Sequence, residues 1–141
     1  MEGELSWREK RREASAAHAA ALEQRKAAET AQARAMLAEF VQKLKAQGIE
    51  PQPLRAPVMG SGASYRTNVI GWYLRRNRSL GTDSDGNFYI LATPASARAR
   101  LLGVRILPSD PPLIVGQGAR DGESIPMKEL LALRLEEVAL S

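Results

Sequence analysis

The sequence predicts an α+β fold: a long N-terminal helix, then a small, mainly antiparallel sheet of three to five strands that packs on a C-terminal helix. A change in composition carries this prediction. Residues 1–48 contain no proline and are rich in alanine, whereas residues 49–141 hold all eight prolines and nine of the eleven glycines. Alanine favours uninterrupted helix, and proline and glycine punctuate short elements. We therefore expect a helical arm over 1–48 and one compact α+β domain over 49–141.

The first helix is predicted from the composition of residues 14–38, of which 12 of 25 are alanine. Alanine is the strongest helix former. We expect the helix to span about 7–47, with Ser6 as its N-cap and Gly48 as its C-cap. At 1.5 Å per residue it would be roughly 60 Å long, more than the diameter of the remaining domain, so part of it must project, fold back or fray.

Two faces of this helix differ in character. An apolar stripe at the spacing i, i+3, i+4, i+7 predicts docking onto the domain, and it consists of Leu37, Phe40, Val41 and Leu44. A seam of small residues at heptad spacing favours the close approach of a second helix. The seam residues expected to face a partner are Trp7, Ala14, Ala21, Ala28 and Ala35. The alternative is a solvated helix that has no partner.

Short apolar runs predict the elements of the domain. We expect an extended segment at 53–59 and strands at 69–76, 87–93, 101–107 and 113–115. A last helix is expected over 126–139, with Ser124 as its cap.

A tight turn at Asp85-Gly86 or Gly86-Asn87 is expected to join the strands 69–76 and 87–93. The same loop matches only the middle positions of a calcium-binding loop, so a turn is the better prediction.

The segment 72–78 is the best candidate for contact with RNA or DNA. It places Tyr73 and a neighbouring tryptophan beside Arg75, Arg76 and Arg78. Base stacking together with phosphate contact needs these residue types. If neighbouring strands pair, further arginines can enlarge the patch, namely Arg66, Arg98, Arg100 and Arg105. The alternative is that Trp72 and Leu74 belong to the core and that the arginines keep a sheet edge soluble.

The glycine-rich segment 116–122 precedes the last helix, which is a context for anion binding. Its spacing matches neither a dinucleotide-binding nor a Walker motif, so a surface turn is the favoured interpretation. If a small anion does bind there, Arg120 is the residue that would hold it.

Composition argues against several classes of function. The absence of cysteine and the single histidine, His18, disfavour disulfide scaffolds, Cys-ligated metal sites and histidine clusters. We find no catalytic constellation, and we expect no cofactor and no metal. The start of the chain lacks an apolar run typical of a signal peptide, and the alanine-rich stretch is too polar to cross a bilayer, so a cytoplasmic protein is expected.

These observations lead to two functional hypotheses. The first is a non-enzymatic assembly or adaptor module that acts through the N-terminal helix. We expect it to self-associate, and a different protein is the other possible partner. The alternative is a nucleic-acid-binding protein that uses the aromatic and arginine residues around 72–78.

Overall fold

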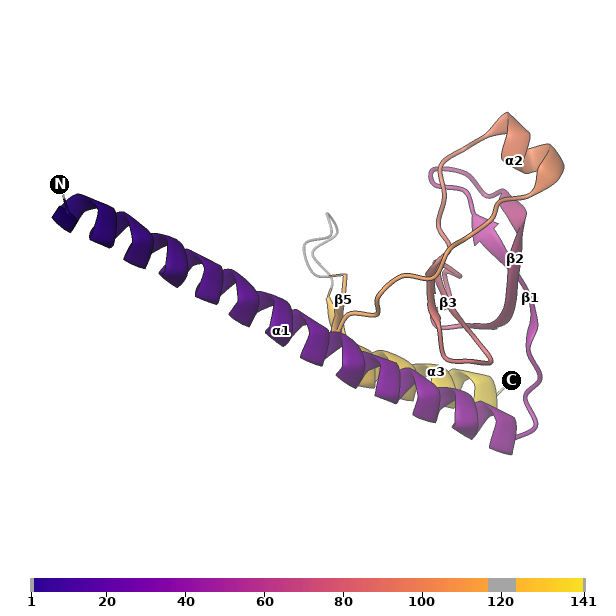
Figure 1. Cartoon of the computed structure of the whole chain (residues 1–141). Coiled ribbons are helices and arrows are strands. Elements are labelled where there is room, and N and C mark those ends of the chain that lie inside the picture. The colour runs from indigo at the N-terminus through magenta and orange to yellow at the C-terminus, as the bar shows by residue number, and fades with distance from the viewer. Residues whose placement is uncertain (1, 117–123, 141) are drawn as a thin grey trace.

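The computed structural model describes residues 2–116 and 124–140, with side chains from Ser6 onward. It has the expected α+β architecture, with a long N-terminal helix, a four-stranded antiparallel sheet and a C-terminal helix (Figure 1). In chain order the elements are α1 (Glu2–Ala46), β1 (Gln52–Pro57), β2 (Ser64–Tyr73), β3 (Leu80–Asp83), β4 (Phe88–Ile90), α2 (Ala97–Leu102), β5 (Ile114–Val115), β6 (Ile125–Pro126) and α3 (Met127–Ala139).

Helix α1 is much longer than the domain needs. Its 45 residues correspond to about 67 Å, and its first half extends away from the rest of the chain (Figure 1). Residues 6–29 are all exposed, and Ala33 is the first buried residue. The helix therefore projects, and we call residues 6–29 the arm.

The sequence predicted the C-terminal end of α1 but not its N-terminal end. The predicted cap at Ser6 is wrong, because the helix already begins at Glu2. Water can satisfy the N–H groups of an exposed first turn, so no capping side chain is required there. Gly48 ends the helix as predicted, with a φ of 71°. The N–H groups of Gly48 and Ile49 donate to the carbonyls of Lys45 and Leu44, which is the Schellman pattern.

The four strands pair in the order β1-β2-β3-β4, and every pair is antiparallel. The sheet rolls up, because the chain after β4 meets the chain after β1. Val58 and Thr93 form a parallel bridge, in which the Met59 N–H donates to the Thr93 carbonyl (2.9 Å) and the Thr93 N–H to the Pro57 carbonyl (3.0 Å). The outer strands thus come together at one corner, and the sheet encloses an interior.

Two apolar clusters result from this rolling. The interior of the sheet holds Leu54, Val69, Tyr73, Tyr89 and Leu91. Gly81 on β3 leaves the room that two of them occupy, since a Cβ there would lie 2.7 Å from a methyl of Leu54 and 3.0 Å from one of Leu91. The outer side of the sheet packs on α1 and α3, in a cluster that includes Leu37, Phe40, Val41, Leu44, Trp72, Leu74, Phe88, Met127, Leu130 and Leu131.

The apolar stripe of α1 therefore docks the helix onto the domain, as predicted. Its four members are all at most 2 % exposed. Helix α3 lies beside the same half of α1 (Figure 1). It begins at Met127 with Pro126 in the N-cap position and no side-chain cap, so the prediction that Ser124 caps it is wrong.

Two other sequence-based expectations need correction. Strand β3 was not predicted, so the Asp85-Gly86 turn joins β3 to β4 rather than the strands expected at 69–76 and 87–93. The strand expected at 101–107 is wrong in its first part, where α2 ends. The Ser96 hydroxyl accepts from the Ala99 N–H (3.2 Å) and caps this helix of alanine, arginine and leucine. The rest of that segment only bridges β2, through Thr67 and Val104.

Candidate functional site: an arginine-lined surface

Positive charge is concentrated in the sheet and in the turn, helix and loop that adjoin it. Residues 51–109 contain eight arginines, two aspartates and neither lysine nor glutamate, which gives a net charge of +6, whereas the whole chain carries +4. Among the residues that the structure describes, seven of these eight arginines form no ion pair, and the exception is Arg76. A division of the chain at residue 48 hides this imbalance, because each part then carries about +2.

Seven of these arginines and Arg134 of α3 line three hollows that adjoin one another. The first hollow, of about 640 Å³, is lined in part by Arg66 and Arg105. The second, of about 590 Å³, shares Arg66 and adds Arg55 and Arg100. The third, of about 350 Å³, shares Arg55. We call this continuous surface the arginine track, and the third hollow the arginine hollow.

Strand pairing places two members of the track directly against each other. Arg55 of β1 and Arg66 of β2 occupy opposite positions of an antiparallel pair, where like charges are destabilising. Backbone and hydroxyl oxygens hold them in place: Arg55 donates to the Ser64 hydroxyl (2.8 Å) and carbonyl (2.9 Å), and Arg66 donates to the Leu101 carbonyl (2.9 Å). Neutral acceptors orient these guanidinium groups without cancelling their charge.

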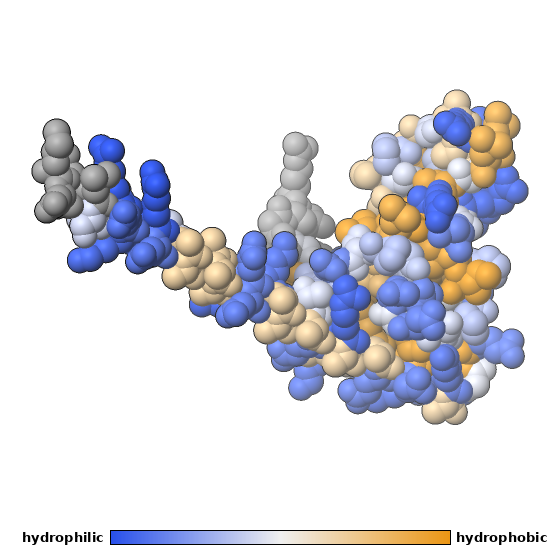
Figure 2. Space-filling model, viewed as in Figure 1, coloured by the Kyte–Doolittle hydropathy of each residue, from blue (hydrophilic) through white to orange (hydrophobic). Residues whose placement is uncertain are grey.

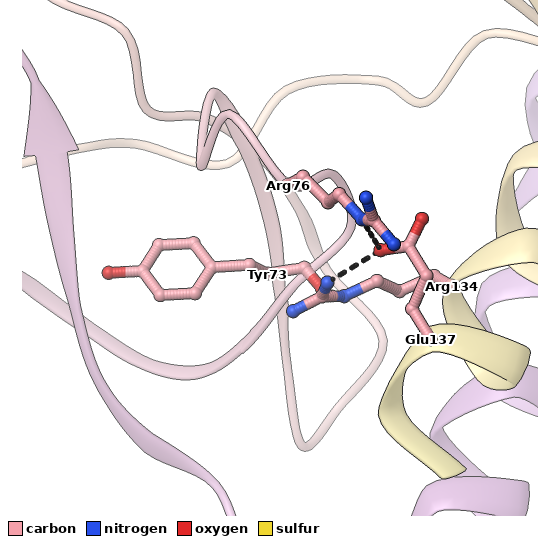
Figure 3. A network of polar contacts seen from close by, with 4 residues as sticks. All are labelled: Tyr73, Arg76, Arg134 and Glu137. Carbon is pink, nitrogen blue, oxygen red and sulfur yellow. Dashed lines mark hydrogen bonds and ion pairs between the residues drawn. The ribbon is translucent and has the colours of Figure 1, made fainter. Parts of the chain in front are cut away.

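The arginine hollow lies where the turn between β2 and β3 approaches α3. Its charged lining residues are Arg55, Arg75, Arg76, Arg78 and Arg134. Figure 3 shows the one carboxylate of this network: a single oxygen of Glu137 accepts from Arg134 Nη1 (3.0 Å) and pairs with Arg76 Nε (3.3 Å). Arg134 Nε also donates to the Tyr73 carbonyl (2.9 Å), so this side chain ties α3 to the end of β2.

The turn itself holds Arg78 in an uncommon backbone conformation. Arg78 is the one non-glycine residue with positive φ (60°) in the described part of the chain, at a cost of roughly 1–2 kcal/mol for a residue with a Cβ. The Asn77 side chain supports the turn by accepting from the N–H (3.0 Å) and hydroxyl (2.7 Å) of Ser79. The Arg78 guanidinium then lies 5.3 Å from the centre of the Tyr73 ring.

The structure corrects the role expected for the aromatic residues. Trp72 and Tyr73 are only 5 % and 7 % exposed. The Trp72 indole N–H donates to the Ile49 carbonyl (3.1 Å), and the Tyr73 hydroxyl accepts from the Arg55 N–H (2.8 Å). Base stacking on Tyr73 is therefore excluded, and the alternative that Trp72 and Leu74 belong to the core is confirmed. Arg75, Arg76 and Arg78 do gather at one place.

The seam predicted on α1 lies in solvent. Trp7 is 60 % exposed, its ring lies 4.9 Å from the Arg11 guanidinium, and the four seam alanines (Ala14, Ala21, Ala28 and Ala35) are exposed. Figure 2 shows hydrophilic (blue) and weakly apolar (pale orange) residues along the visible face of the arm, whereas the strongly apolar (deep orange) residues lie on the domain. The seam is thus exposed in the described part of the chain.

The remaining sequence candidates that the structure describes behave as ordinary surface or turn residues. Arg120 lies outside the described residues, and His18 is an exposed helix residue. Asp83 accepts from the N–H groups of Asp85 and Asn87, from the Asn87 amide and from the Tyr89 hydroxyl. Within residues 2–116 and 124–140, no cluster of carboxylate and imidazole groups is arranged to hold a metal ion.

These hydrogen bonds shift two pKa values. Burial acts to raise the pKa of Asp83, but the bonds from Asn87, Tyr89 and Asp85 outweigh it and the pKa is lowered. Burial and the Asp83 carboxylate together raise the pKa of Tyr89 to about 12. Asp83 is therefore the anchor of the β3–β4 turn.

Comparison of the chain with protein-family models, with curated proteins and with solved structures gives no significant match. In the part of the chain that the structure describes, no helix combines the length and the apolar character that a membrane span requires. Functional inference therefore depends on the geometry of the arginine track and of the arm.

Proposed function

We propose that this protein binds nucleic acid through the arginine track, by contacts to the phosphate backbone. The observation that carries the proposal is the continuity of the track, whose three hollows are joined by shared arginines. Along β2 alone, from Arg66 to Tyr73, the surface extends for about 23 Å at 3.3 Å per residue. A basic surface of this length matches several consecutive phosphates of a nucleic-acid strand.

The chemistry of the track favours phosphate over carboxylate partners. Arginine presents a planar fork of donors that pairs with two phosphate oxygens at once. All eight basic residues of 51–109 are arginine. Because the neighbouring aromatic rings are buried, recognition rests on the backbone of the nucleic acid, with little dependence on base sequence.

The experiment is fluorescence anisotropy with labelled 20-nucleotide single strands of RNA and DNA and a DNA duplex, between 50 and 200 mM salt. The track variant carries Arg66→Gln, Arg100→Gln and Arg105→Gln. Its matched control removes three exposed arginines of the arm through Arg8→Gln, Arg12→Gln and Arg25→Gln. Each lost phosphate contact lowers the slope of log K against log salt by about 0.7–0.9, so the track variant should flatten the slope by about 2–3 while the control leaves it near that of the wild type. Absence of binding at 50 mM salt, or equal losses in both variants, would refute the proposal.

Assembly through the arm is the second candidate function, and the sequence alone favours it. The supporting observation is that 24 consecutive residues (6–29) of a helix anchored by a buried stripe are exposed in the part of the chain that the structure describes. Such a segment adds no burial to the domain and is available to a protein partner or to a second copy. The seam offers mainly methyl groups, worth about 0.8 kcal/mol each when buried, so we expect weak association and rank this function second.

The test is molar mass by light scattering over a range of protein concentrations. Ala21→Glu with Ala28→Glu places charges on the seam, and Ala16→Glu with Ala19→Glu places the same charges on the opposite face of the helix. If the arm self-associates, only the first variant should lower the mass to that of the 15.4 kDa monomer. A wild-type protein that remains monomeric at every concentration would leave only a different protein as partner.

A further inference from the structure

The arginine hollow differs from the rest of the track in its charge density. Five guanidinium groups surround about 350 Å³. Among the residues that the structure describes, Glu137 supplies the one carboxylate paired with any of them. Its partners are Arg76 and Arg134, so Arg55, Arg75 and Arg78 have no acidic partner among those residues. A net charge of about +4 is therefore confined to a small volume, which a bound anion would neutralise.

The position of Glu137 shows that the surrounding groups already converge on an anionic oxygen. One oxygen of its carboxylate receives donors from two different elements, Arg76 of the β2–β3 turn and Arg134 of α3. In Figure 3 both guanidinium groups point toward this carboxylate, while the Tyr73 hydroxyl points away from it. A ligand with two or three anionic oxygens can use the same donors and also reach the unpaired arginines.

The backbone conformation of the turn gives an independent indication. Arg78 keeps a positive φ, although glycine or asparagine would adopt that conformation with less strain. Strained residues gather at ligand-binding sites, where the surrounding structure holds a side chain in place for its partner. Here the strain keeps a long cationic side chain over the Tyr73 ring at the rim of the hollow.

We propose that the arginine hollow is a binding site for a phosphate monoester. A phosphate monoester carries about −1.5 to −2 charges at pH 7 and three acceptor oxygens, whereas each internal phosphodiester of a strand carries one charge. The monoester matches the excess of positive charge better, and each arginine fork can pair with two of its oxygens. The group is either the terminal phosphate of a nucleic-acid strand, in which case the inference rests on the function proposed above, or the phosphate of a free nucleotide.

The test compares a 20-nucleotide single strand with and without a 5′-phosphate, together with a nucleoside monophosphate and inorganic phosphate. Strand affinity is measured by anisotropy, and the small ligands by calorimetry and by the shift in melting temperature. We expect the phosphorylated strand to bind at least about fivefold more tightly than the unphosphorylated one. Arg75→Gln with Arg78→Gln should abolish this preference and leave most of the affinity for the unphosphorylated strand, since the rest of the track is intact.

Glu137→Gln should change the affinity for phosphate monoester in the opposite direction. It removes the resident carboxylate, so the affinity for phosphate monoester should rise several-fold, while the control Glu129→Gln on an exposed position of the same helix should have no effect. Melting curves verify that each variant is folded. If the strand binds more tightly with its 5′-phosphate and the small ligands do not bind, the hollow is assigned to strand ends. If the nucleoside monophosphate binds, the hollow is assigned to free nucleotides.

The two proposals fail in different ways. Tight binding of the unphosphorylated strand, with no preference for the 5′-phosphate and no response to the small ligands, overturns the monoester site and leaves the track. Binding of the nucleoside monophosphate without any binding of strands supports the hollow and overturns nucleic-acid binding. An affinity for phosphate that Glu137→Gln lowers, in a folded protein, also contradicts the proposed site.

Discussion

Replacement of Gly71 by alanine tests the pairing of β2 and β3, which positions the arginine turn. A Cβ at Gly71 would lie 2.8 Å from both the Asp83 Cα and the Thr82 carbonyl carbon, and closer still to the Thr82 carbonyl oxygen. Carbon atoms in contact prefer about 3.5–4.0 Å, so the strands must separate by roughly 1 Å. These are backbone atoms, and no side-chain rotation can relieve the collision.

The expected cost follows from the pairs that this separation disturbs. Strands β2 and β3 pair at Gly71–Asp83, Trp72–Thr82 and Tyr73–Gly81, all close to the buried core. A buried polar group left without its hydrogen bond costs about 1–3 kcal/mol, so we expect Gly71→Ala to lower the free energy of unfolding by about 4 kcal/mol. For a chain of this size this corresponds to a fall in Tm of roughly 10–15 °C.

The assay is thermal and urea unfolding followed by circular dichroism, with Gly62→Ala as the matched control. Gly62 has no atom within 4 Å of its added Cβ and no positive φ, so its variant should unfold like the wild type or slightly above it, as the unfolded chain loses freedom. A Gly71→Ala protein that melts within about 2 °C of the wild type would show that β2 and β3 do not approach as described.

Three further predictions concern the anchor of the arm and the β3–β4 turn. Phe40→Ala should lower the free energy of unfolding by about 3–5 kcal/mol, because its ring is only 2 % exposed in the main cluster. The control Leu22→Ala, at a 48 % exposed position on the arm, should change the free energy of unfolding by no more than about 0.5 kcal/mol. Similar losses for both variants in urea titrations would contradict the docking of α1. The lowered pKa of Asp83 stabilises the fold above its unfolded pKa of about 3.9, and this contribution is lost as the pH falls through the lower folded pKa. Asp83→Asn should therefore melt earlier at pH 7 and lose less stability between pH 5 and 2, and parallel Tm curves for the two proteins would refute this. The raised pKa of Tyr89 gives stability the opposite pH dependence. The stabilisation by its protonated hydroxyl is complete below the unfolded pKa of about 10 and is lost as the pH rises through about 12. Ultraviolet titration of the wild type and of Tyr89→Phe can follow this ionisation.

Local chemistry explains which elements were predictable. The alanine-rich composition of residues 14–38 and the Gly48 cap predict α1 because propensity and capping act over a few neighbouring residues. The stripe of Leu37, Phe40, Val41 and Leu44 could be assigned to the core from its spacing alone. The same argument fails for α2, where leucines that look like part of a strand are 72–76 % exposed and the cap at Ser96 decides the outcome.

The candidate site could be predicted only in part. The grouping of Arg75, Arg76 and Arg78 is visible in the sequence because the three residues share one turn. The excess of positive charge in 51–109 is also visible there, once charged residues are counted over this segment and not over 1–48 and 49–141. The participation of Arg134 and Glu137 was not predictable, since α3 meets the β2–β3 turn only through tertiary packing. The burial of Tyr73 was also hidden, because neighbouring residues of β2 alternate between two separate clusters.

By itself, the sequence determined the α+β class, the long helix and its docking stripe, and the excess of arginine in residues 51–109, since each depends on composition or on short-range periodicity. Tertiary structure alone decided that the sheet rolls until Val58 meets Thr93 and that Trp72 and Tyr73 are buried on opposite sides of the sheet. It also decided that arginines from β1, the β2–β3 turn and α3 surround one hollow. The physical reason is that these features bring together residues far apart in the sequence, such as Arg55 and Arg134, which line one hollow although 79 positions separate them. Local pattern carries no information about which distant segments pack together.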